Sequence, residues 1–196
     1  MDAGSRQLRD RIRRALDGER AAIDRPGLVR AAVLVPFVWR AGEAFVVFTQ
    51  RTMEVATHKG QISFPGGAAE PEDADAVATA LREAREEIGL DPRLVEVAGA
   101  LPDGVTTTGF VVTPIVAFVD PAASLAADPT EVAEVFELPF AGLADPAAHA
   151  VEEAEHRGAR YVNHSFDVGG RHVWGVTGRI LATLLDALAA ADGRAS

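Results

Sequence analysis

Apolar and polar positions follow two periods along this chain, one typical of helices and one typical of strands. Leu8, Ile12 and Leu16 recur every four residues among charged neighbours, which predicts an amphipathic helix over residues 5–17. A nearly continuous apolar run over 29–39 predicts a central strand buried on both faces. Strand-like runs follow at 44–50, 94–101, 111–119 and 132–138, and leucines at helical spacing predict a closing helix over 180–188.

A glycine pair marks a turn near the end of the chain. Gly169 and Gly170 separate strand-like segments at 161–168 and 171–175, an arrangement typical of a β-hairpin. The segments 120–130 and 141–158 predict mobile loops. The order of strands, one helix, strands and a final helix predicts an α/β fold with a mixed sheet between helices. Because no repeat or linker interrupts the sequence, residues 1–196 are expected to form a single domain, with an N-terminal helix inside residues 1–25.

Three carboxylates gather on one short helix in the middle of the chain. On an ideal helix Glu83, Glu86 and Glu87 fall within about a quarter turn of one another. The apolar residues of this segment lie on a separate arc and predict its buried side: Val77, Leu81, Ala84 and Ile88. Like charges at this spacing repel, and a divalent cation would relieve the repulsion. Carboxylate oxygens suit Mg²⁺ or Mn²⁺, so the acidic side is a candidate metal site.

The ends of this helix and one neighbouring cation can also be interpreted. Asp73 or Asp75 can cap the first turn, and Gly89 suits the left-handed position after the last turn. Arg82 lies four residues before Glu86, so the two side chains can form an ion pair. Such a pair would hold the carboxylate in place for a metal ion. Arg82 is therefore expected to orient a ligand and to take no direct part in catalysis.

The segment from Gly66 to Leu90 resembles a Nudix box. Residues 82–90, Arg-Glu-Ala-Arg-Glu-Glu-Ile-Gly-Leu, match the second half of that signature completely. In the first half Asp73 stands where glutamate is usual, and eight residues separate it from Arg82 in place of seven. This combination of aspartate and longer spacing resembles the pattern of the coenzyme A pyrophosphatase branch of the Nudix family.

A second motif, upstream of the box, resembles the same branch. It comprises residues 47–51, Val-Phe-Thr-Gln-Arg, and residues 58–67, His-Lys-Gly-Gln-Ile-Ser-Phe-Pro-Gly-Gly. Thr52 stands where the branch has serine or alanine, and Ala56 replaces an arginine that is a candidate phosphate contact. Further segments similar to the branch lie at 101–110, 112–114, 131–139 and 174–177, so the resemblance covers about residues 30–185.

The resemblance implies a fold, a reaction and a set of site residues. The fold is the α/β/α sandwich of the Nudix type. The reaction is attack of water on the diphosphate of coenzyme A, which gives 3′,5′-ADP and 4′-phosphopantetheine. The implied ligands of Mg²⁺ or Mn²⁺ are Glu83, Glu86 and Glu87, with a backbone carbonyl near Gly67. The general base is either a box glutamate or Glu131 in a later loop, with Glu134 as a reserve.

Other residues are candidates for contacts with the substrate. Gly66 and Gly67 begin the box, and Arg51 and Lys59 precede it. Each of these two cations is interpreted either as a phosphate contact or as an ordinary surface charge. Three aromatic residues can stack on adenine, but their strand-like spacing favours positions in the core: Phe110, Tyr161 and Trp174.

Composition restricts the partners. The formal net charge of −10 excludes nucleic acid and acidic membrane as main partners, because both need basic patches. The same charge opposes an anionic substrate, which makes a bound metal ion more necessary. The chain has no cysteine, which excludes disulfides, zinc thiolates and a thiol nucleophile. It has neither an apolar stretch of about 20 residues nor the pattern of a secretory signal. The expected location is the cytoplasm, and the oligomeric state is left open.

Three functions follow for comparison. The first is hydrolysis of coenzyme A or its derivatives. The second is hydrolysis of another dinucleotide, such as ADP-ribose or NADH, and the absence of arginine at position 56 favours it. The third is ligand binding without turnover, which the complete set of carboxylates disfavours. Metal dependence separates the enzymes from the binding protein.

Overall fold

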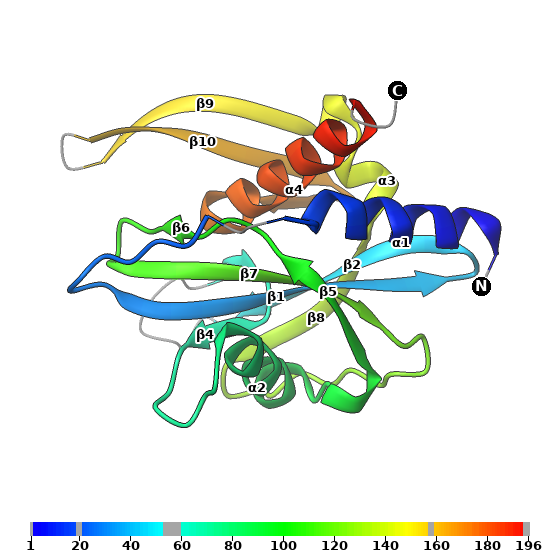
Figure 1. Ribbon diagram of the computed structural model, residues 1–196, viewed down its shortest axis with the longest axis horizontal. Helices are drawn as coiled ribbons and strands as arrows, with labels where there is room; N and C mark the ends of the chain where they lie inside the picture. The colour runs from blue at the N-terminus through cyan, green and yellow to red at the C-terminus, as the bar shows by residue number, and fades with distance from the viewer. Residues whose placement is uncertain (1, 19–20, 53–59, 157–158, 194–196) are drawn as a thin grey trace.

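The computed structural model describes residues 2–18, 21–52, 60–156 and 159–193. Its centre is an eight-stranded sheet in which β3, β2, β1, β7 and β5 follow one another, while β4, β6 and β8 pair with β1, β7 and β2 (Figure 1). The strands are β1 Val29–Arg40, β2 Glu43–Arg51, β3 Ile62–Ser63, β4 Gly66–Ala68, β5 Val95–Ala100, β6 Gly104–Val105, β7 Phe110–Val119 and β8 Val132–Pro139.

The middle of the sheet is a parallel pair flanked by antiparallel neighbours. β1 and β7 run parallel, in register from Val29 opposite Phe110 to Phe37 opposite Phe118. β2 runs antiparallel to β1, and β5 runs antiparallel to β7. β1 and β7 carry the long apolar runs of the sequence and are buried along most of their length. The expected mixed sheet is therefore confirmed.

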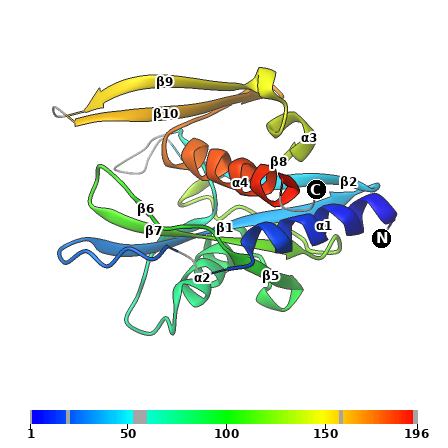
Figure 2. The same cartoon turned by 45° about the horizontal axis from the view of Figure 1, so that its top comes forward.

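Helices cover both faces of this sheet. Helix α2 (Ala76–Ile88) packs on one face, where Ala84 and Ile88 join Leu34 and Val38 of β1 in one core. Helices α1 (Ala3–Leu16) and α4 (Gly175–Gly193) pack on the opposite face, over a second core that includes Phe37 of β1 (Figure 2). Successive side chains of a strand point to opposite faces, so β1 contributes to both cores. The α/β/α sandwich expected from the sequence is confirmed.

The two terminal helices lie side by side. Asp2 caps α1 by accepting a hydrogen bond from the Ser5 amide, so the helix begins slightly earlier than its apolar period alone indicated. Arg11 of α1 forms an ion pair with Asp192 near the end of α4. No helix in the described part of the chain is both long enough and apolar enough to cross a bilayer.

Helix α2 has the ends that its sequence predicts. The Asp75 carboxylate accepts a hydrogen bond from the Ala78 amide, which makes Asp75 the N-cap. Gly89 has φ 65°, and its amide donates to the carbonyls of Ala84 and Arg85. Asp73 does not cap this helix, because its carboxylate pairs with Arg82. A short helical turn at Pro92–Leu94 then leads into β5.

The prediction of a loop over 141–158 is wrong. This segment contains the end of the short helix α3 (Phe140–Leu143), a helical turn at Pro146–Ala148 and most of strand β9 (His149–His156). β9 pairs with β10 (Ala159–Val168), which pairs with β11 (Arg171–Val173) across the expected glycine turn. These strands form a second sheet beside α4 (Figure 2). β9 is mostly polar, so it lacks the apolar alternation by which strands are recognised.

Candidate active site

The glycine pair that begins the box lies where backbone and side chains leave no room for a larger residue. Gly66 and Gly67 form part of β4, opposite Val33 and Ala32 of β1. A Cβ atom at Gly66 would clash with the Ala32 carbonyl, and one at Gly67 would clash with the Glu83 carboxylate. The close approach of β4 to β1 therefore requires glycine at position 66, and a side chain at position 67 would displace the Glu83 carboxylate.

Glu87 is the buried carboxylate of the box. Only 5% of its side chain is exposed, and its Oε2 accepts a hydrogen bond from the Gly66 amide at 3.1 Å. Burial raises the pKa of Glu87 to about 7, although the Gly66 amide and the nearby Arg51 guanidinium oppose the shift. Glu87 is thus a partly desolvated carboxylate that a further positive charge would stabilise.

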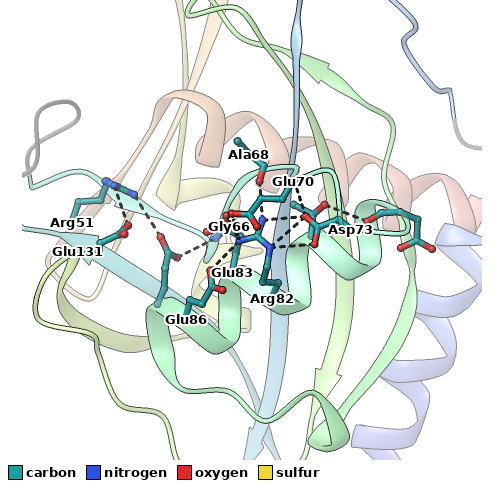
Figure 3. Close-up of polar contacts among 12 residues, drawn as sticks. Arg51, Gly66, Ala68, Glu70, Asp73, Arg82, Glu83, Glu86 and Glu131 are labelled. Atoms are coloured by element: carbon teal, nitrogen blue, oxygen red, sulfur yellow. Dashed lines mark hydrogen bonds and ion pairs between the residues drawn. The ribbon is translucent and has the colours of Figure 1, made fainter.

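Arg82 organises the two other box carboxylates. Its Nη1 donates to Glu83 Oε1 at 3.0 Å and to Glu86 Oε2 at 2.9 Å (Figure 3). Its Nη2 donates to the Ala68 carbonyl at 2.9 Å and to Asp73 Oδ2 at 3.1 Å. The predicted pair of Arg82 with Glu86 is confirmed, and the bonds to Asp73 and Glu83 are additional.

The electrostatics of this cluster differ from one carboxylate to the next. Hydrogen bonds from Arg82 lower the pKa of Asp73 to about 2, so Asp73 is ionised throughout the neutral range. Burial raises the pKa of Glu83, and the charge of Arg82 opposes this rise. Asp73, the residue that departs from the usual box pattern, therefore fixes Arg82, and Arg82 in turn positions Glu83 and Glu86.

Arg51 connects the box to a segment far away in the sequence. Its Nη1 lies 3.6 Å from Glu87 Oε1, and its Nη2 lies 3.7 Å from Glu131 Oε2 (Figure 3). The Thr52 amide also donates to the Glu131 carbonyl, which holds this segment against the end of β2. Glu134, the reserve base, instead forms an ion pair with Arg171 of β11 at 2.7 Å.

The three box carboxylates differ strongly in accessibility. Glu86 is 51% exposed and Glu87 only 5%, with Glu83 between them. In the described ranges no three acidic, histidine or cysteine side chains form a cluster that could hold a metal ion as they stand. The donor set nevertheless suits a hard cation, because it combines carboxylate oxygens with a backbone that passes directly against Glu83.

The remaining predictions for this region have mixed outcomes. Lys59 and position 56 lie outside the described residues. Phe110 is partly buried and packs against the core. The expectation of core positions for Tyr161 and Trp174 is wrong, because these side chains are 44% and 46% exposed. Both line a pocket of roughly 430 Å³ together with Arg179, a residue that sequence patterns did not single out.

Comparison with known proteins places the chain in a family. The NUDIX domain model matches residues 28–164, which is most of the chain. Relatives named uncharacterized Nudix hydrolase NudL, from Salmonella paratyphi B and Salmonella newport, are 38% identical over 161 residues, or 79% of this chain and 80% of theirs.

Solved structures of related architecture are more distant. A Caenorhabditis elegans Ap4A hydrolase binary complex has a TM-score of 0.49 at 18% identity, over 58% of this chain and 82% of its own. The NUDIX domain of Shewanella oneidensis NrtR, complexed with ADP ribose, has a TM-score of 0.48 at 19% identity, over 58% and 74%. At these levels neither structure informs the substrate of this chain. The match to the family model and the identity to the NudL proteins are decisive, and the chain belongs to the Nudix hydrolase family.

Proposed function

We propose that this Nudix hydrolase cleaves the diphosphate bond of coenzyme A, in a reaction that depends on Mg²⁺ or Mn²⁺ and yields 3′,5′-ADP and 4′-phosphopantetheine. One observation carries the choice of substrate. Three segments that resemble the coenzyme A branch are far apart in sequence, yet Gln61, Thr106 and Trp174 from these segments line one pocket. Arg51 links this pocket to the box: its amide donates a hydrogen bond to the Gln61 carbonyl, and its Nη1 lies 3.6 Å from Glu87 Oε1.

The proposed metal ligands are Glu83, Glu86 and Glu87, with the carbonyl of Gly67. When bound, the ion polarises the phosphoryl oxygens and lowers the pKa of a coordinated water. Arg82 holds Glu83 and Glu86 on one side of α2, so that neither ligand has to be ordered when the cation arrives. The glycine at position 67 lets the backbone approach these carboxylates.

The chain supplies the charge and the base for the reaction itself. Arg51 contacts Glu87 and Glu131, and we assign its guanidinium as the contact that would offset the charge of the diphosphate. Glu131 is 55% exposed, so its carboxylate is open to water and can take the proton of the attacking water molecule. A box glutamate is the alternative general base.

The proposal is tested by supplying one substrate at a time to the purified protein in Mg²⁺. Coenzyme A, ADP-ribose, NADH and a nucleoside triphosphate are compared, and the products are separated by chromatography. We expect coenzyme A to be the preferred substrate, with 3′,5′-ADP released. The variants Glu86→Gln and Glu87→Gln should abolish the release, whereas Glu43→Gln, an exposed position at the start of β2, should not change it.

Other results would replace the proposal. Preferred cleavage of ADP-ribose or NADH would keep the family and change the substrate, in agreement with the alanine at position 56. Absence of metal-dependent turnover with every substrate would indicate a binding protein.

A further inference from the structure

The pocket beside the box has an unusual pair of exposed aromatic side chains. Tyr161 comes from β10, and Trp174 immediately precedes α4. Almost half of each side chain is exposed although both residues carry large apolar rings. Exposed aromatic rings that line a pocket of this size are suited to stacking on a planar aromatic ligand such as a nucleobase.

Arg179, in the second turn of α4, supplies a positive charge to the same pocket. Its Nη1 donates to the Val105 carbonyl at 2.8 Å, but its Nη2 is buried and has no hydrogen-bond partner among the residues that the structure describes. No carboxylate in the described ranges forms an ion pair with it, and burial lowers its pKa. A partly buried cation without a counter-ion is costly to maintain, so an anionic ligand on this wall would stabilise it.

The start of α4 adds a second source of positive potential. Helix α4 has 19 residues and begins directly after Trp174, whose carbonyl accepts a hydrogen bond from the Gly178 amide. Gly175 and Val176, at its first positions, line the pocket. The first amides of a helix have no partner within the helix, and the dipole favours an anion there. Arg179 and the helix start therefore favour a phosphate in the same pocket as the aromatic pair.

Residues 61–66 connect the pocket to the glycine pair of the box, so one extended substrate can reach both. Gln61 lines the pocket and bonds through its carbonyl to the amide of Arg51, whose guanidinium contacts Glu87 and Glu131. Thr177 of α4 also donates to the Ile62 carbonyl, which ties the pocket to β3. The chain from Gln61 to Gly66 spans at most about 18 Å when fully extended. A nucleotide in the pocket can therefore place its 5′-diphosphate toward the box.

We infer that this pocket binds the 3′-phosphoadenosine end of coenzyme A, with the base against Tyr161 and Trp174 and the 3′-phosphate facing Arg179 and the start of α4. The inference rests on the proposed function and deepens it. It makes the 3′-phosphate the group by which the enzyme distinguishes coenzyme A from ADP-ribose and NADH, which carry none.

Calorimetry can test the inference without turnover, because it measures binding of the nucleotide product 3′,5′-ADP. The metal is chelated by EDTA. The wild-type protein should bind 3′,5′-ADP at least about tenfold more tightly than 5′-AMP, because a charge-assisted bond to phosphate accounts for the difference. Arg179→Met should remove this preference, and Arg179→Lys should keep part of it. Trp174→Ala should weaken the binding of both nucleotides by a similar factor, about tenfold.

Controls distinguish the loss of a phosphate contact from the loss of the folded state. Arg93→Met removes the same charge from an exposed residue and should leave the preference unchanged. The wild type and Arg93→Met should hydrolyse dephospho-coenzyme A, which lacks the 3′-phosphate, less efficiently than coenzyme A, and Arg179→Met should reduce this difference. A wild-type protein that binds the two nucleotides equally, or an Arg179→Met variant that still prefers 3′,5′-ADP, would overturn the inference.

Failure of the inference can be told from failure of the proposed function. Equal hydrolysis of coenzyme A and dephospho-coenzyme A by the wild type leaves coenzyme A as a substrate and overturns only the role of the 3′-phosphate. Tight binding of 3′,5′-ADP that depends on Arg179, without hydrolysis of coenzyme A, upholds the pocket and overturns the reaction.

Discussion

Two arginines in this molecule have opposite environments, and the contrast distinguishes a structural cation from a binding cation. Arg82 donates to Asp73, Glu83, Glu86 and the Ala68 carbonyl, so its charge is neutralised within the protein. Arg179 donates to the Val105 carbonyl, and its buried Nη2 finds no partner in the described part of the chain. A neutralised guanidinium fixes its neighbours, whereas the uncompensated charge of one without a counter-ion favours an anion nearby. Four predictions challenge or refine this distinction, from the largest effect to the smallest.

The largest effect is expected at the proposed base, which Arg51 holds near the box. Glu131→Gln should lower kcat for coenzyme A by a factor of about 10²–10⁴ with little change in KM, because only proton transfer is removed. Steady-state kinetics at saturating Mg²⁺ measure this. Glu134→Gln is the matched control, since Glu134 pairs with Arg171 and should lose little activity. A comparably small loss of kcat in both variants would indicate that a box glutamate is the general base.

Loss of the neutralised arginine should act through the metal. Arg82→Met removes the donor shared by Glu83 and Glu86, and the affinity for Mg²⁺ should fall by about 10- to 100-fold. Titration of activity with Mg²⁺ measures the shift, and excess metal should restore much of kcat. Arg93→Met, at an exposed arginine, serves as the control and should need no additional metal. An unchanged Mg²⁺ requirement in Arg82→Met would remove its positioning role.

The burial of Glu87 should appear as a dependence of stability on pH in the metal-free protein. Since its pKa is raised from 4.5 to about 7, the folded state holds a proton that the unfolded state releases. Its contribution is fully present below pH 4.5 and is lost as the pH rises through about 7.

Substitution of Glu87 should therefore remove this dependence. Wild type should lose about 3 kcal/mol relative to Glu87→Gln between pH 4.5 and 8, as measured by urea unfolding in EDTA. Glu43→Gln should follow the wild-type curve. Parallel curves for wild type and Glu87→Gln would show that the carboxylate is not desolvated.

The smallest effect is expected on the stability contributed by the pocket aromatics. Trp174→Ala should change the free energy of unfolding by no more than about 0.5 kcal/mol, because the ring is largely exposed. Phe48→Ala, at a fully buried ring, should cost about 3–5 kcal/mol. A large loss of stability in Trp174→Ala would indicate that the ring contributes to core packing, which would weaken its assignment to ligand binding.

The sequence predicted those parts of the fold that depend on local patterns. The buried strands around 29–39 and 111–119, the ends of α2 and the pair of Arg82 with Glu86 all follow from periodicity or short spacing. β9 was missed because most of its residues are polar, and residues 150–153 are all exposed. Tyr161 and Trp174 were misplaced because the strand period states which residues share a face and not whether that face is covered. The partnership of Arg51 with Glu131 and the isolation of Arg179 depend on segments that meet only in three dimensions.

The parallel pairing of β1 with β7 has a consequence for the order in which structure and activity return during refolding. Parallel strands cannot be joined by a tight turn, and the crossover between these two contains Arg51, the glycine pair and the whole of α2. The box is thus enclosed in the loop that this contact closes, and distant contacts of this kind form slowly. During refolding, α2 can acquire its helical hydrogen bonds early, but the contacts of Glu87 with Gly66 and Arg51 join more distant segments and form later. Recovery of turnover should therefore lag behind recovery of helical signal.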